Sequence, residues 1–449
     1  MYVYIIVRAK AYFYMLSNLN GINTSNIYNV QPAKAKASAG VSVSMPQNNA
    51  IAPAFTSYNT VNVAKTTLTS QAEIKKYTEV SANLDTDGKK ALDYMLKTGL
   101  LLNNKSNDKS STLDNLHKII TNKRADGLSA SVMLNDTVKT IANPAIITQH
   151  FGNIPEKFKD AIMEYDNTAK EVPHSGCCVA ASIEYNLASQ MPAEFARVAE
   201  GLSSEKMSSS KTIDLSNLCD NKDDAKWLLD NFKIPYQMKE NNKAEVTLAP
   251  DKNAIIRAHI QTIDKDEIER SPLDVLMQST FMNVGSQQTY NSLNDIRVAS
   301  FGPGDRGLVE IEKTFTESVV TDTNKTAVTF QDVQEATDAE GNTVAKLAGY
   351  RASENTVKRS ILNSLAEGQN VIIGYTSTDN DNNIIGGHEI TIVGAKTTAD
   401  GKLIFVCNDT DDDSPELIEY HEDYIVPRIH HVGLPTEVVE ADSKLKSIA

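Results

Sequence analysis

Four cysteines and eight histidines are the residues best suited to nucleophilic or metal chemistry in this chain of 449 residues. No two cysteines have C-x-x-C spacing, and no cysteine and histidine spacing is typical of a zinc site, so we expect no metal and no cofactor. The adjacent pair cannot easily close a disulfide. We therefore expect free thiols, one of them reactive. The cysteines are Cys177, Cys178, Cys219 and Cys407.

Cys178 has the most favourable local sequence, within HSGCCVAAS at 174–182. Ser175 is suited to cap a helix that follows it, which places Cys178 at the helix N-terminus. Unpaired N–H groups and the positive end of the helix dipole stabilise a thiolate there. A cysteine among alanine and valine more often serves packing, so this motif does not identify a catalytic residue by itself.

Two further motifs lie downstream. GGHEITIVG (386–394) places His388 at the start of a predicted strand, after glycines that allow close approach. LIFVCNDTDDD (403–413) ends a second strand in Asn408 and Asp409, residues that also favour ordinary turns. If the two runs form a hairpin, His388 faces Asp409, with Asn408 one register step away. Because a slip of one residue changes the face, the sequence leaves open which of the two orients His388.

The elements that must position these residues follow from hydrophobic periodicity. Residues 1–75 are rich in Asn, Ser, Thr and Ala, and we expect a disordered tail. Residues 76–151 have a helical pattern, and the last fifteen residues, 435–449, are polar and expected to fray. The remaining pattern predicts an α+β class. It indicates helices at 178–188, from Ser271-Pro272 and at 354–366, and strands at 254–260, 370–375, 388–394 and 403–407.

These motifs together resemble the papain-like cysteine peptidases. Gly176–Ser182 matches the family's Gly, Cys, Ala and Ser positions, and His388–Gly394 fits its His-x-Val-x-x-Val-Gly strand. The family's Asn follows an apolar strand as Asn408 does. The bacteriocin-processing members use Asp instead, which favours Asp409. The resemblance covers about 170–210 and 350–410, in the family's order of Cys, His and Asn or Asp.

The resemblance implies a papain-like fold, in which the helix carrying the nucleophile packs on an antiparallel sheet carrying His and Asn or Asp. It also implies acyl transfer through the Cys178 thiolate, with His388 as base and then acid. The expected reaction is hydrolysis of a peptide or isopeptide bond in a protein or peptide substrate.

The sequence departs from the family pattern near the nucleophile. Val179 stands where Trp or Tyr is expected, and Val172 occupies the position of the oxyanion-binding Gln. Gln149 is the nearest upstream Gln and is the candidate for that role beside the Cys178 N–H. Loss of one such donor costs about 10²–10³ in rate.

The domain organisation follows from the same comparison. A catalytic domain is expected at 152–434, with an insertion within about 220–350 that accounts for the long spacing between Cys178 and His388. The helical region at 76–151 is then a possible pro-region that covers the cleft until it is cut. The alternative is that it packs permanently as part of one domain.

Composition limits the partners. Lys and Arg number 44 against 58 Asp and Glu, a net charge of −14, and without a basic block the chain is not expected to bind nucleic acid or an anionic membrane. No apolar run is long enough for a membrane span. Arg8 and Lys10 interrupt the apolar N-terminus, which fits a secretory signal poorly, so a cytoplasmic location is the default expectation.

Two rival functions remain. A transglutaminase-type acyl transferase uses Cys, His and Asp, and Asp409 as the third residue would favour it. A papain-like binding or scaffold protein without activity would retain the fold. The absence of Gln at position 172 favours the scaffold, whereas the retained order of Cys, His and Asn or Asp opposes it.

Overall fold

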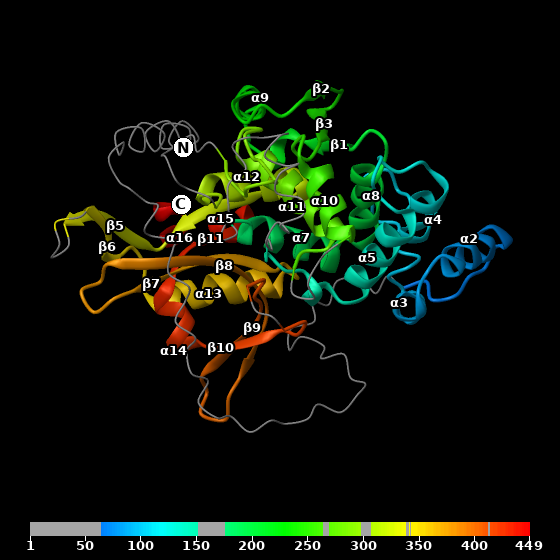
Figure 1. Ribbon diagram of the computed structural model, residues 1–449. Helices are drawn as coiled ribbons and strands as arrows, with labels where there is room; N and C mark the ends of the chain where they lie inside the picture. Colours follow the sequence, from blue (N-terminus) through cyan, green and yellow to red (C-terminus); the bar gives the residue numbers. More distant parts are fainter. Residues whose placement is uncertain are drawn as a thin grey trace.

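The computed structural model describes most of the chain from residue 64 onward. Its elements combine helices with antiparallel sheets, which confirms the predicted α+β class (Figure 1). Residues 1–63, which hold most of the predicted tail, and the predicted capping residue Ser175 lie outside the described part. The described residues are 64–150, 176–263, 269–297, 307–337, 341, 343–411 and 414–449.

Helices surround the segment that carries Cys178, and they bury one continuous apolar core. The region expected at 76–151 contributes to this core together with the cysteine helix, so the two pack as one body. The helices of this half are α2 (Gln71–Ala82), α3 (Thr86–Thr98), α4 (Thr112–Thr121), α5 (Ala130–Ala142), η2 (Pro144–Ile146), α7 (Cys178–Gln190), α8 (Pro192–Ser203), α10 (Ala254–Ile263) and α11 (Pro272–Gly285).

Capping residues fix where several helices begin. Ser271 accepts a hydrogen bond from the Asp274 N–H and Pro272 takes the first helical position, so α11 starts where the sequence predicts. Helix α7 begins at Cys178, as expected, but the residue before it, Cys177, makes no side-chain capping bond. Contacts from other parts of the fold must therefore hold the first turn of α7.

A six-stranded antiparallel sheet in the order β10-β9-β8-β7-β11-β4 forms the other half, with α7 between it and the helices (Figure 1). The strands predicted at 370–375, 388–394 and 403–407 are its centre. The strands are β4 (Lys325–Thr329), β7 (Val371–Thr378), β8 (Ile384–Thr397), β9 (Leu403–Asn408), β10 (Ile418–His421) and β11 (Ile429–Pro435).

Helices cover both faces of this sheet. Helix α12 (Glu310–Thr321) packs on one side, and α13 (Glu354–Ala366), predicted at 354–366, packs on the other (Figure 1). A second apolar core fills the space beneath α13. The short elements that complete it are α14 (Glu422–Ile425), η4 (Val426–Arg428), α15 (Thr436–Ala441) and α16 (Ser443–Ile448).

The β8–β9 hairpin turns closer to Asp400–Gly401 than predicted. Thr391 pairs with Asn408, a displacement of two residues from the expected pairing. His388 therefore does not lie directly opposite Asp409. Asp409 instead follows the end of β9 and approaches His388 diagonally, on the same face of the hairpin.

Two smaller sheets lie between these halves in the sequence. A three-stranded sheet, β1 (Ser209–Asp214), β3 (Lys243–Leu248) and β2 (Tyr236–Met238), packs with η3 (Leu215–Asn217) and α9 (Lys222–Asn231) around a third core. A hairpin joins β5 (Gln331–Thr337) and β6 (Thr343–Tyr350). The interval 220–350, where we expected an insertion, holds these elements except β1 and η3, and also holds α11 and α12, which belong to the main body.

The strand predicted at 254–260 is wrong, because this segment forms α10. Four of its five buried positions, Ala254, Arg257, Ala258 and Gln261, recur at the spacing of one helix face, and Ile260 is the fifth. A short run of alanine and isoleucine fits the period of a strand and of a buried helix alike. Tertiary contacts with α11 decide in favour of the helix.

The frayed tail predicted at 435–449 is also wrong. These residues complete β11 and then form α15 and α16. Val439 and Leu445 are buried in the core beneath the sheet. The polar residues of the segment face outward, and the few apolar ones suffice to anchor it.

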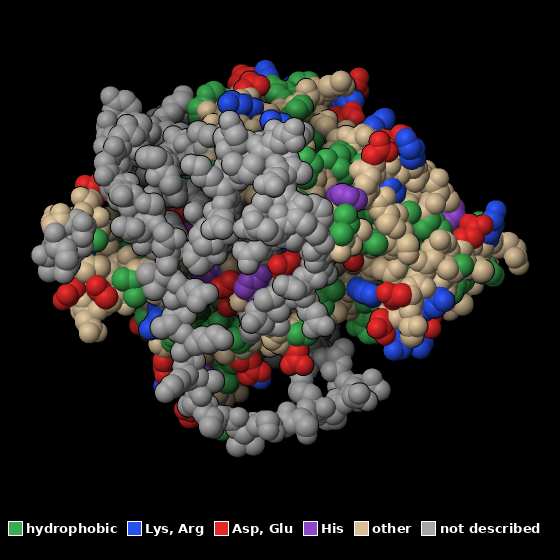
Figure 2. Space-filling view, in the orientation of Figure 1, with side chains coloured by type: hydrophobic (Ala, Val, Ile, Leu, Met, Phe, Trp, Pro, Cys, Tyr) green, Lys and Arg blue, Asp and Glu red, His purple; other side chains and the backbone are tan. Residues whose placement is uncertain are grey.

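Acidic and basic side chains lie next to one another over the helical half of the molecule (Figure 2). Lys76 pairs with Asp114 and Lys139 with Asp85. Such exposed pairs are worth about 0–1 kcal/mol each, so the apolar cores carry the stability. Among the described residues, no helix combines the length and apolar character needed to cross a bilayer.

Removal of residues 1–151 is expected to unfold the remaining chain. Leu92, Leu116 and Met133 lie in the core that holds α7. Each such side chain contributes about 1.5–3 kcal/mol, against a total stability of about 5–15 kcal/mol. Circular dichroism and thermal melting of a chain that starts at Gly152 check this. A soluble, folded truncated chain that reacts faster with a thiol probe would instead support a removable inhibitory segment.

Candidate active site

The first turn of α7 presents Cys178 as a partly exposed thiol. Val179, Ile183 and Leu187 are buried and fix the rotation of the helix about its axis. The Cys178 N–H is one of the first four of the helix, which have no partner within it. Thiol and N–H donor therefore lie together at the positive end of α7.

A buried polar network holds the segment just before Cys178. The Asp295 carboxylate accepts hydrogen bonds from the Gly176 N–H at 2.6 Å and from the Cys177 thiol at 3.1 Å. The Tyr290 hydroxyl donates to the same carboxylate at 2.6 Å, and Arg270 donates to the Cys177 sulfur at 3.4 Å. Cys177 is thus a structural residue that fixes the start of α7.

The network continues through Gln278 on α11. Its side-chain oxygen accepts from Arg270 at 3.2 Å, and its nitrogen donates to Glu184 of α7 at 3.0 Å and to the Thr148 carbonyl at 2.9 Å. Helix α7, helix α11 and the segment around residue 148 are therefore joined by buried hydrogen bonds. A buried network of this kind permits one arrangement of its members.

The imidazole of His388 faces the end of α7 from strand β8. Its Nε2 lies 2.7 Å from Asp409 Oδ1, and it makes a side-chain hydrogen bond with Cys178. Because Asp409 occupies Nε2, Nδ1 is the nitrogen left to face the thiol. Tyr375 pairs with His388 across the sheet, and its ring packs edge to face on the imidazole with 5.8 Å between the ring centroids. This contact limits rotation of the imidazole.

Asp409, rather than Asn408, contacts His388. Its carboxylate also accepts from the Tyr420 hydroxyl at 2.8 Å and the Asp411 N–H at 3.1 Å. Asn408 is buried in the last position of β9, where its backbone pairs with Thr391. The alternative that the sequence left open is thus settled by contact in favour of Asp409.

The electrostatics of this pair favour a charged imidazole. Burial lowers the pKa of His388, but the charge and hydrogen bond of Asp409 outweigh it and hold the pKa well above its ordinary value. Burial raises the pKa of Asp409, but His388 and Tyr420 outweigh it and lower that pKa. His388 and Asp409 are only 12% and 9% exposed, so their attraction is weakly screened.

Gln149 lies against the loop that carries Asp409. Its N–H donates to the Thr410 carbonyl at 2.9 Å, and its side-chain nitrogen donates to Asp411 at 2.9 Å. Its side-chain oxygen accepts from the Thr410 hydroxyl. These contacts make Gln149 a support of the acidic loop, and its role as an oxyanion donor stays a prediction.

The other three cysteines are less suited to nucleophilic chemistry. Burial raises the pKa of Cys177 and of Cys407, and the nearby carboxylates Asp295 and Asp409 raise them further. Burial also raises the pKa of Cys219. Cys178, in contrast, lies beside the imidazole of His388.

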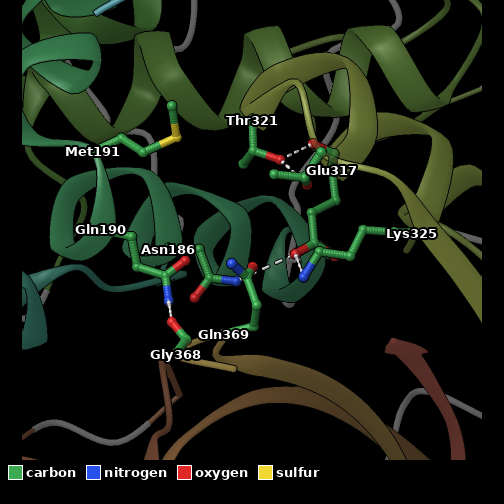
Figure 3. A pocket seen from close by; sticks show the side chains of 9 residues that line it. Asn186, Gln190, Met191, Glu317, Thr321, Lys325, Gly368 and Gln369 are labelled. Carbon is green, nitrogen blue, oxygen red and sulfur yellow. Dashed lines mark hydrogen bonds and ion pairs between the residues drawn. The ribbon is translucent and has the colours of Figure 1, made fainter. Parts of the chain in front are cut away.

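A separate pocket of about 330 Å³ lies at the far end of α7 (Figure 3). Asn186 and Gln190 from the helix line it, with Glu317 and Lys325 opposite. Asn186 and Gln190 lie about 12–18 Å along the helix from Cys178. Glu317 pairs with Lys325 at 3.2 Å, and Cys178, His388 and Asp409 do not line this pocket.

Sequence reasoning missed the residues that support the site. Arg270, Tyr290 and Asp295 carry no local motif, and their contacts with Gly176 and Cys177 join positions 93 to 119 residues apart. It also passed over the adjacent pair His430-His431, which lies near Glu310. Two neighbouring histidines among eight in the chain are a signal that could have been noticed.

Comparison of the chain with protein family models, with curated proteins and with solved structures finds no match.

Asp409→Asn is expected to make His388 lose its proton at lower pH, because a neutral amide stabilises the imidazolium less than the carboxylate does. In the native chain the raised pKa of His388 adds stability that is complete below about pH 6.5 and is lost as pH rises through the folded-state pKa. Histidine NMR titration measures the shift, and melting against pH measures the linked loss of stability. An unchanged His388 titration in the variant would contradict the assigned contact.

Proposed function

We propose that this chain is a cysteine-dependent hydrolase of peptide or isopeptide bonds. The observation that carries the proposal is the meeting of Cys178, His388 and Asp409 from α7, β8 and the end of β9. A reachable thiol, an imidazole beside it and a carboxylate behind that imidazole are the components of a nucleophilic triad. The papain-like resemblance belongs to the same proposal, supported by the cysteine helix packed against an antiparallel sheet.

In the proposed reaction the Cys178 thiolate attacks the substrate carbonyl carbon. Protonated His388 then gives its proton to the leaving amine as the carbon–nitrogen bond breaks, and an acyl thioester remains. His388 next takes a proton from water, whose oxygen attacks the thioester carbon. The carbon–sulfur bond breaks, the carboxylic acid leaves and the thiolate–imidazolium pair is restored.

Two groups assist these steps without forming bonds to the substrate carbon. Asp409 keeps Nε2 of His388 engaged, so that Nδ1 stays turned toward the sulfur. The Cys178 N–H, at the first turn of α7, is suited to stabilise the oxyanion that forms on the carbonyl oxygen. Partial burial of the site strengthens both effects, because it lowers the local dielectric constant.

A transglutaminase-type acyl transferase is the second candidate, and Asp409 as the third residue is the observation that favours it. The two candidates share the thioester and differ in what attacks it next, a water or a primary amine. Asp409 alone does not separate them, because the bacteriocin-processing peptidases also use an aspartate. The fate of the acyl group is therefore the deciding measurement.

Cys178 is expected to be the residue that a vinyl sulfone or epoxide probe labels first. Intact mass and peptide mapping identify the adduct, and Cys178→Ala is expected to abolish it. Cys219→Ala is the matched control, since it removes the other partly exposed thiol, which lies near the carboxylates of Asp220 and Asp224. Labelling of Cys178 no faster than Cys219 would favour the inactive scaffold.

His388→Ala is expected to lower both probe labelling and turnover, by about 10²–10⁴-fold, because one imidazole serves both half-reactions. Turnover is measured on a mixed peptide library by mass spectrometry, with and without a primary amine such as putrescine. Release of free carboxyl termini supports hydrolysis, and amine adducts on the acyl product support transfer. Unchanged turnover in the variant would rule out His388 as the base.

A further inference from the structure

A second cluster of metal-binding side chains lies at the start of α12 and on β11. Its members are Glu310, His430 and His431, whose candidate ligand atoms lie within 4.8 Å of one another. We call them the Glu310 cluster. None of them belongs to the Cys178, His388 and Asp409 triad, so the cluster needs an explanation of its own.

A bulge in β11 brings two neighbouring histidines to the same side. Side chains of consecutive strand residues normally point to opposite faces of a sheet. The pairing with β7 shifts between Ile429 and His431, so His430 is the extra residue. As a result the Nδ1 atoms of His430 and His431 lie 2.8 Å apart. Bulges re-aim side chains in this way next to functional sites.

The three ligand atoms have the spacing of a tetrahedral metal site. Glu310 Oε1 lies 3.3 Å from His430 Nδ1 and 3.8 Å from His431 Nδ1, with 2.8 Å between the nitrogens. Ligands about 2.0–2.1 Å from a tetrahedral zinc ion are separated by about 3.3 Å. The observed separations lie on both sides of that value, so small side-chain rotations suffice for coordination.

Contacts behind His431 and Glu310 leave one ligand atom of each residue available to the cluster. Nε2 of His431 lies 2.8 Å from Glu389 Oε1, and the nearby carboxylate favours the tautomer that has its proton on Nε2 and its lone pair on Nδ1. Thr329 donates to Oε2 of Glu310 at 2.7 Å and leaves Oε1 for the cluster. A carboxylate behind a histidine ligand is the usual outer layer of metal sites.

Charge and space are also arranged for a cation. Lys313 pairs with Glu389 at 3.0 Å, which leaves the Glu310 carboxylate as the negative charge at the cluster. Gly374 lies beneath it, where an added Cβ would be 2.3 Å from the His431 ring and 2.5 Å from Glu389. Only glycine at 374 lets the imidazole and its carboxylate take these positions.

We infer that Glu310, His430 and His431 bind a divalent metal ion of the zinc class, with the fourth coordination position open to water. Imidazole and carboxylate ligands suit zinc, and three protein ligands plus an open position describe a non-structural zinc site. The ion would join the first turn of α12 to the bulge of β11. It would lie near Glu389, the residue that follows His388.

Metal binding is tested on the full-length, tag-free chain after removal of metals with a chelator. Equilibrium dialysis with Zn²⁺ is expected to give one tightly bound ion per chain, and the melting temperature is expected to rise with zinc concentration. Co²⁺ in its place is expected to give the intense visible absorption of a four-coordinate site. Glu310→Gln and His431→Ala are each expected to weaken zinc binding at least tenfold.

Controls separate this site from other ligands in the chain. His259→Ala removes an exposed imidazole and is expected to bind zinc as the native chain does. Cys178→Ala is expected to keep the ion as well, so failure of the proposed triad leaves the metal site untouched. Glu310→Gln keeps the side-chain volume, and its melting temperature without metal reports folding separately.

Three results would overturn the inference. The native chain could bind no zinc above the level of the His431→Ala variant. The bound ion could be lost in Cys178→Ala, which would place it at the triad. The Co²⁺ complex could show the weak absorption of a six-coordinate, adventitious ion.

Discussion

The Asp295 carboxylate, buried at the first turn of α7, is the contact on which the geometry of the site depends. It accepts from Gly176, Cys177 and Tyr290, and Arg270 lies close enough to offset its charge. A buried carboxylate is costly unless such partners are complete. The loop after α11, which carries Asp295, therefore has one favourable position. In that position the Cys178 thiol is directed toward the sheet.

The sheet provides the matching half with a different device. Strand β8 is central, and its alternating side chains carry His388 toward Asp409 and Glu389 toward Lys313 and His431. His388 and Glu389, which are adjacent on one strand, thus belong to two separate clusters of charged side chains. A register slip of one residue would exchange them and leave both groups mispaired, so the pairing of β8 with β7 and β9 is strongly specified.

Local patterns predicted those parts of the site that depend on neighbouring residues. The helix that begins at Cys178, the strand that carries His388 and the acidic residue after β9 all follow from short motifs and apolar periodicity. The resemblance to the papain-like order of Cys, His and Asn or Asp also implied that these motifs would meet. The segment 254–260 shows the limit, since an alanine and isoleucine run has no period long enough to separate strand from helix.

Long-range contacts could not be predicted in the same way. Asp295 and Arg270 reach Gly176 and Cys177 across 93 to 119 residues of sequence, and nothing near Asp295 or Arg270 in the sequence marks them as buried. The diagonal approach of Asp409 depends on a bulge near Ile392 and on the length of one turn. Likewise, His430 and His431 share a side only because β11 is bulged, and a regular strand would separate them.

The position of the triad in the sheet sets how its members respond to local opening. Strand β8 pairs with β7 at His388 and also with β9 from Thr391 onward, so its backbone is expected to open at a higher free energy than an edge strand does. Asp409 depends on Tyr420 of β10, which is an edge strand and opens at lower free energy. Fluctuation of that edge can loosen the carboxylate while the thiol and imidazole stay in place. An edge strand of the sheet thereby influences the proton affinity of a histidine on a central strand.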